Sequence, residues 1–147
     1  MQLAYDYLGE AALMDLDDIE HNTRDGLHMA SLAGSWIALV CGLGGMRDHN
    51  GILTFAPRLP DRISRLAFGI RWRGSVLRVE VGPDSATYRV TSGDPVPFGH
   101  HGERLEASTD KPVTAPIPKI TPLTPAPPQP AHRRPARRDS SPAGHTA

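Results

Sequence analysis

The chain has 147 residues, including 15 prolines, and its 16 basic and 16 acidic side chains give a formal net charge of zero. That length suffices for one domain with a substantial core and is short for two. Zero net charge excludes a general electrostatic attraction to nucleic acid or to anionic membranes. The N-terminus resembles no secretory signal, and no apolar run approaches the ~20 residues that span a bilayer. We therefore expect a cytoplasmic protein without nucleic-acid or membrane partners.

Apolar side chains recur at helical spacing from Leu3 to Ala12, so residues 2–14 are predicted to form an amphipathic helix. An acidic cluster follows this helix at once. It lacks the glycine and the terminal glutamate of a calcium-binding loop, so we interpret it as a solvated linker and expect no metal site. Its members are Asp15, Asp17, Asp18 and Glu20.

A second helix is predicted from Leu27 to Leu43, after the turn and capping residues of segment 22–26. Its apolar side chains fall on nearly all faces. A helix of that kind is expected to be buried among other elements. The glycines at 42, 44 and 45 supply conformations that end a helix.

Beyond residue 51 the hydrophobic period changes from helical to two, which is typical of strands. Strands are predicted at 52–55, 66–72, 77–81 and 86–90, in a small antiparallel sheet with one apolar face that needs a partner surface. Ten of the prolines lie from Pro112 onward, so residues 107–147 are expected to form a disordered tail with an arginine cluster. The fold class is therefore α+β.

Three polar side chains interrupt the apolar helix at spacings of three and four residues, which places them on one helix face. They are His28, Ser31 and Ser35, and Gly34 beside them leaves room for a close approach. Hydroxyls, an imidazole and a helix N-terminus together can bind a phosphate group. The alternative is that these side chains form hydrogen bonds to neighbouring helices, and spacing alone favours that structural role.

The segment from Asn22 to Trp36 resembles the last barrel helix of glycoside hydrolase family 65, which includes trehalose, maltose and kojibiose phosphorylases and related hydrolases. The similarity continues through Leu53–Phe55, Pro57–Pro60 and Leu66–Val81 and covers roughly residues 3–92. The matching positions of the helix are Asn22, Thr23, Asp25, Gly26, His28, Ala30, Ser31, Gly34, Ser35 and Trp36.

This resemblance implies that residues 1–46 are the last helices of an α/α-barrel catalytic domain, that 47–106 are its C-terminal β-domain, and that 107–147 are a Pro/Arg-rich tail. It also implies a phosphate site at His28, Ser31, Gly34 and Ser35, with inorganic phosphate as a possible co-substrate and no cofactor. The family's general acid has no counterpart here, so no catalytic residue is expected in this chain. The family's phosphorylases commonly have Gly-Gly where this chain has Ala33-Gly34. Phosphorolysis and hydrolysis therefore both stay open.

Two functional hypotheses follow from the sequence. In the first, the chain is the C-terminal part of an inverting phosphorylase or hydrolase of α-linked disaccharides such as trehalose or maltose. It is then inactive without the upstream catalytic portion, which is its expected partner unless the chain forms a homo-oligomer. In the second, it is a non-catalytic interaction module that packs against a partner chain and binds no phosphate at His28.

Overall fold

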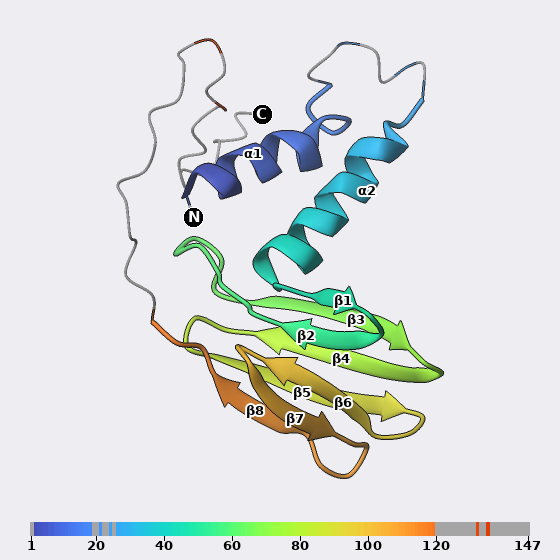
Figure 1. Cartoon of the computed structure of the whole chain (residues 1–147). Helices are drawn as coiled ribbons and strands as arrows, with labels where there is room; N and C mark the ends of the chain where they lie inside the picture. Colours follow the sequence, from blue (N-terminus) through green and yellow to red (C-terminus); the bar gives the residue numbers. More distant parts are fainter. Residues whose placement is uncertain are drawn as a thin grey trace, which may run out of the picture. The chain divides into compact units, whose positions relative to one another are not determined.

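The structure is a computed structural model that describes residues 2–18, 21, 24, 26–119, 132 and 135. Its contacts divide the chain into two compact units. Unit 1 comprises residues 1–35 and 125–147, and unit 2 comprises residues 36–124. Unit 1 holds α1 (Gln2–Leu13) and most of α2 (Met29–Ile37), whereas unit 2 holds the end of that helix and the strands (Figure 1). No helix in the described ranges is long and apolar enough to cross a membrane.

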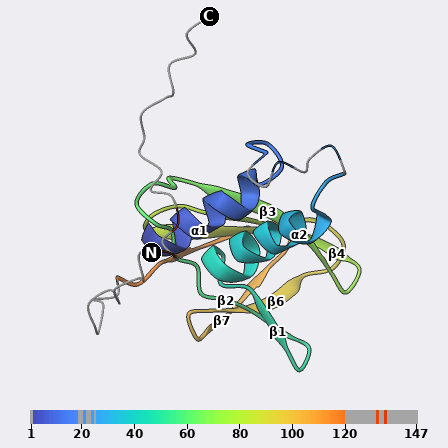
Figure 2. The same cartoon turned by 90° about the horizontal axis from the view of Figure 1, so that it is seen from above.

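Both predicted helices are present. α1 confirms the helix expected over residues 2–14, and α2 continues into a wider π-helical turn, η2 (Ala38–Leu43), at the end of the predicted second helix. α1 and the first turns of α2 can be followed from the side in Figure 1 and from above in Figure 2. Backbone bonds widen to the spacing of a π-helix here, since the amide of Gly44 donates to the carbonyl of Leu39 at 2.8 Å.

The prediction that the second helix is buried on every side is wrong for this chain. Val40 and Leu43, in η2, are buried, but the large apolar side chains before them are exposed. Within unit 1, α1 is the one described helix or strand beside this segment, so most of its circumference has no protein cover. The exposed fractions are 64% for Leu27, 68% for Met29, 41% for Leu32, 49% for Trp36 and 54% for Ile37.

Unit 2 is a sandwich of two four-stranded sheets (Figure 1). The first sheet has the order β1-β2-β6-β7 and the second the order β3-β4-β5-β8. The first contains β1 (Arg47–His49), β2 (Ile52–Phe55), β6 (Val96–His100) and β7 (Glu103–Ala107). The second contains β3 (Leu66–Trp72), β4 (Ser75–Val81), β5 (Ser85–Ser92) and β8 (Val113–Pro116).

The single antiparallel sheet expected from the sequence is therefore two sheets, and one strand pair, β2 with β6, is parallel. Pro95 and Pro97 hide the alternation of buried residues in β6, which is why that strand was not predicted. The expected disorder from residue 107 is wrong for residues 113–116, because β8 forms four backbone pairings with β5. Most residues from 120 onward, including the arginine cluster, lie outside the described ranges.

The core of unit 2 lies between the two sheets, so the first sheet covers the apolar face of β3, β4 and β5 that was predicted to need a partner surface. Phe55, Tyr88 and Phe98 pack against one another in tilted and edge-to-face arrangements, with the Tyr88 and Phe98 ring centroids 4.3 Å apart. Burial raises the pKa of the Tyr88 hydroxyl, which therefore stays protonated. The hydroxyl forms a 2.8 Å hydrogen bond with Nδ1 of buried His100, and Nε2 of that ring lies 2.9 Å from the carbonyl of Pro116.

Gly45, which follows η2, makes a close backbone contact with Ala56, which follows β2. Gly45 has a φ of 64°, and a Cβ built on it would lie 2.3 Å from the carbonyl oxygen of Ala56. Glycine alone fits both the left-handed conformation and this close approach. The amide of Ala56 in turn donates to the carbonyl of Gly45 at 3.2 Å, which joins the end of the helix to the segment after β2.

Truncating a core side chain should destabilise unit 2 far more than truncating an exposed one. Leu77 is fully buried, so Leu77→Ala is expected to lower the free energy of unfolding by about 2–5 kcal/mol. Ile52 is 63% exposed, and Ile52→Ala should change it by less than about 0.5 kcal/mol. Urea denaturation followed by tryptophan fluorescence measures both variants. Equal losses would show that the core is not where the structure has it.

Candidate functional site

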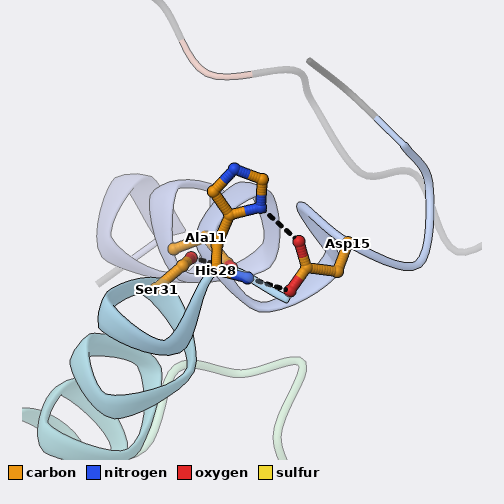
Figure 3. Close-up of polar contacts among 4 residues, drawn as sticks. All are labelled: Ala11, Asp15, His28 and Ser31. Carbon is orange, nitrogen blue, oxygen red and sulfur yellow. Dashed lines mark hydrogen bonds and ion pairs between the residues drawn. The ribbon is translucent and has the colours of Figure 1, made fainter. Parts of the chain in front are cut away.

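His28 is the residue from which α2 starts. Its carbonyl accepts the first helical hydrogen bonds, from the amides of Ser31 at 2.9 Å and Leu32 at 3.1 Å. Its own amide donates to Oδ2 of Asp15 at 2.9 Å, and its ring Nδ1 lies 2.5 Å from Oδ1 of the same carboxylate (Figure 3). One side chain from the segment after α1 therefore holds both the backbone and the ring of His28.

The Asp15 side chain is only 10% exposed, whereas the His28 side chain is 32% exposed. Hydrogen bonds from the His28 ring and amide hold the pKa of the Asp15 carboxyl below its ordinary value. The carboxylate is therefore ionised at neutral pH and can only accept, so we assign the ring proton to Nδ1. Nε2 is the ring nitrogen left for another contact, because Nδ1 is engaged by Asp15.

Ser31 also faces α1. Its hydroxyl donates to the carbonyl of Ala11 at 2.6 Å (Figure 3). This carbonyl belongs to the last turn of α1, where helical carbonyls lack a partner within their own helix. The hydroxyl proton of Ser31 is thereby committed to joining the two helices and is not free to donate to a ligand.

The other two predicted site residues are in different surroundings. Ser35 is 7% exposed, and its hydroxyl has no hydrogen-bond partner among the described residues. Buried hydroxyls without a partner are uncommon and costly, and they require an explanation. Gly34 has no atom within 4 Å of the position that a Cβ would occupy, so that side of the helix is open.

The structure thus joins His28 and Ser31 to the end of α1, and leaves Gly34 and Ser35 outside this hydrogen-bonded group. Asn22, Thr23 and Asp25, the candidate capping residues, lie outside the described residues.

The sequence interpretation missed Asp15, which it placed in a solvated linker. Asp17 and Asp18 are indeed exposed, but Asp15 is not. The signal was present in the spacing, because Asp15 follows Ala11 and Ala12 at four and three residues and so continues the apolar face of α1. Within the described ranges, no three His, Cys, Asp or Glu side chains gather as a metal ion would require.

Comparison with known proteins gives the family. The model of the glycosyl hydrolase family 65 central catalytic domain matches residues 1–37, and that of the family's C-terminal domain matches residues 46–107. The chain belongs to glycosyl hydrolase family 65, and the two matches occur in the order that the sequence predicted. Together they cover both helices and most of the sandwich.

Individual relatives agree with this assignment. The chain is 50% identical over 140 residues to an uncharacterized glycosyl hydrolase of Mycobacterium tuberculosis, an alignment that covers 94% of this chain and 18% of that protein. It is 37% identical over 102 residues to an alpha,alpha-trehalose phosphorylase of Thermoanaerobacter brockii, covering 69% of this chain and 13% of the relative. The chain therefore spans less than a fifth of the length of these relatives.

A solved structure shares the fold. It is a human-microbiome protein provisionally assigned as a kojibiose phosphorylase, and it matches with a TM-score of 0.73 and 26% sequence identity. The match covers 80% of this chain and 17% of that one. The mixed α+β architecture of two helices and two small sheets is thus similar to part of a family 65 structure.

The Asp15–His28 contact gives a prediction about pH. The Asp15 pKa is lowered in the folded chain, so the contact contributes stability that is present above the unfolded value of 3.8 and is lost as pH falls through the folded pKa. The His28 amide proton, which donates to this carboxylate, should therefore titrate in NMR spectra with a midpoint below 3.8. Asp61→Asn, at an exposed position, should leave that midpoint unchanged, and Asp15→Asn should abolish it. A midpoint at or above 3.8 would contradict the contact.

Proposed function

We propose that this chain supplies the last helices of the α/α-barrel and the C-terminal β-domain of an inverting α-glucoside phosphorylase or hydrolase. The matches to the central and C-terminal family models, in that order along the chain, support this assignment. Its substrates would be α-linked disaccharides such as trehalose or maltose, and it would act in the cytoplasm. No cofactor is needed, with inorganic phosphate as co-substrate if the reaction is phosphorolysis.

The observation that carries the phosphate-binding proposal is the carboxylate-oriented imidazole of His28. Asp15 engages Nδ1, so an anion would approach from Nε2, which can donate to it only when the ring carries both protons. Ser35 has a buried hydroxyl without a partner, and Gly34 leaves open space beside it. We assign His28 and Ser35 as the donors of the site, Gly34 as the position that admits the ligand, and Ser31 as a residue that positions α2 against α1.

In such an enzyme, phosphate, or a water whose proton is taken by a general base, attacks the anomeric carbon from the face opposite the leaving oxygen. A carboxylic acid on the other face protonates that oxygen, and the bond to the leaving sugar breaks with inversion. In this proposal the acid lies upstream of residues 1–46, and the present chain holds the phosphate side of the reaction only. Asp15 does not take the role of the acid, since its carboxylate is bonded to His28.

The exposed apolar side chains of α2 also support an incomplete domain. Exposed apolar patches of this kind mark surfaces that another protein surface covers. In this proposal the remaining helices of the catalytic barrel cover them, and a second copy of the chain is the other candidate. The second functional hypothesis, an interaction module without catalysis, also predicts these exposed side chains. It differs in predicting that no phosphate binds at His28.

The first test is activity. The purified chain, incubated with trehalose or maltose and phosphate, should release no detectable glucose 1-phosphate or glucose, because the general acid is missing. Addition of the part of the Mycobacterium tuberculosis relative that lies outside the matched region should restore turnover. Phosphorolysis or hydrolysis by the chain alone would overturn the proposal.

The second test is phosphate binding by the complemented protein, followed on the His28 ring resonances. Ser35→Ala should weaken phosphate binding about 10-fold, the effect of losing one hydrogen bond to a charged ligand. Ser31→Ala makes the same chemical change at a hydroxyl that donates to Ala11, and it should alter affinity by less than about 2-fold. An equal effect of both variants would refute the assignment of donors. Unshifted His28 resonances would favour the interaction module.

A further inference from the structure

Unit 2 contains a cavity of about 680 Å³ that neither the family resemblance nor the proposed function uses. It runs along β6, with β2 on one side and β7 on the other, and we call it the β6 groove. It is defined by Ile52 and Thr54 of β2, Pro97 and Gly99 of β6, and Glu103 and Arg104 of β7. Its volume lies within the ~300–1,000 Å³ that is typical of small-molecule sites.

The strand pairing explains why a hollow forms here. β2 and β6 pair at only two positions, Thr54 with Gly99 and Phe55 with His100. Ile52 and Leu53 have no partner in β6 in this register, so the two strands part toward their N-terminal ends. Gly99 adds no side chain to the floor, and a Cβ there would lie 3.0 Å from the methyl group of Thr54. The groove is therefore a consequence of backbone register and of one glycine.

The end of the groove nearest the start of β6 is held by two hydrogen bonds, one between two turns and one from the first residue of β4 to a turn. Arg73, in the β3–β4 turn, donates to the carbonyl of Gly51 in the β1–β2 turn at 2.9 Å. The hydroxyl of Ser75 donates to the carbonyl of Asp94, in the β5–β6 turn, at 2.9 Å. Arg73 takes a left-handed φ of 47°, a conformation that non-glycine residues rarely hold unless surrounding contacts impose it. Three turns are thus locked around the rim before any ligand arrives, which lowers the entropic cost of binding.

The chemistry of the lining selects the class of ligand. The lining offers hydrogen-bond donors in the guanidinium groups of Arg73 and Arg104, and acceptors in the carboxylate of Asp94 and the backbone carbonyl of Glu103. Guanidinium groups only donate and carboxylates only accept, a combination that suits hydroxyl groups, which do both. Ile52, Pro97 and the half-buried Trp72 add apolar surface between these polar groups. A ligand with apolar ring faces and hydroxyl edges matches this arrangement.

We propose that the β6 groove is a binding site for neutral saccharides, separate from the phosphate site of unit 1. The groove lies wholly on residues of unit 2 and requires no part of the catalytic barrel. A site of this kind would hold a sugar chain on the β-domain without taking part in bond cleavage.

The test is an amide NMR titration of the full chain with maltotriose. The amides of Gly51, Gly99 and Gly102, which line the groove, should shift and saturate, whereas that of Gly82, which does not line it, should stay in place. Inorganic phosphate at the same concentrations should leave all four unchanged. Shifts by phosphate in place of maltotriose, or saturable shifts confined to residues outside the groove, or no shifts, would each overturn the proposal.

Two matched variant pairs sharpen this test. Asp94→Asn and Arg104→Ala should each weaken maltotriose binding about 10-fold, the effect of losing one charged hydrogen bond. Asp84→Asn and Arg89→Ala make the same changes at exposed positions away from the groove and should leave affinity within about 2-fold. The Asp94 carbonyl that accepts from Ser75 is kept in Asp94→Asn, so the rim should stay intact. Equal affinities across both pairs would exclude the groove as the site, whatever the outcome of the phosphate experiment at His28.

Discussion

The sandwich depends on a buried chain of hydrogen bonds that runs from Tyr88 through His100 to the carbonyl of Pro116. Its members come from β5, β6 and β8, so it joins the two sheets in the middle of an apolar core. A carbonyl can only accept, so Nε2 of His100 carries a proton, and Nδ1 accepts from the Tyr88 hydroxyl when the ring is neutral. A shift of β6 by one residue would leave the Tyr88 hydroxyl and the His100 ring buried without these partners, at a cost of several kcal/mol. This constraint fixes the position of β6 opposite β5 and β8.

Strands with plain alternation were predicted almost to the residue, as β2 and β3 show. β6 and β8 were missed because proline marks both segments as irregular. Pro97 and Pro116 are nonetheless exposed. Pro116 lies in the edge strand β8, and Pro97 lies in β6, whose neighbour β2 has only four residues. The parallel pairing of β2 with β6 joins residues more than 40 positions apart, and no local pattern carries that information. Periodicity thus identified strands, while their assembly into two sheets depended on long-range contacts.

In the candidate site, too, the local sequence pattern predicted part of the arrangement and long-range contacts determined the rest. Helical spacing correctly placed His28 and Ser31 toward a common neighbour, but it could not identify Asp15 and the Ala11 carbonyl as their partners. The burial of the second helix was predicted from its apolar composition, and most of that helix is exposed here. An apolar composition indicates that a segment is stable in buried surroundings, but it does not show that this chain supplies them. The exposed face of α2 is therefore informative about what a complete catalytic domain would have to cover.

The Asp15 carboxylate imposes a condition on any anion at His28. It orients the imidazole, but it also places a negative charge on one side of the ring, so a phosphate would be repelled there and could bind only at Nε2 of the doubly protonated ring. The Ser31 hydroxyl already donates a hydrogen bond to the Ala11 carbonyl of α1. Of the two serines on the predicted polar face, only Ser35 therefore has a hydroxyl still available to donate. One imidazole and one hydroxyl are few donors for a phosphate dianion, which has many acceptor positions. The remaining donors would have to come from other parts of a complete enzyme. The number of donors therefore indicates, as the family resemblance does, that the site we propose is only part of a phosphate pocket.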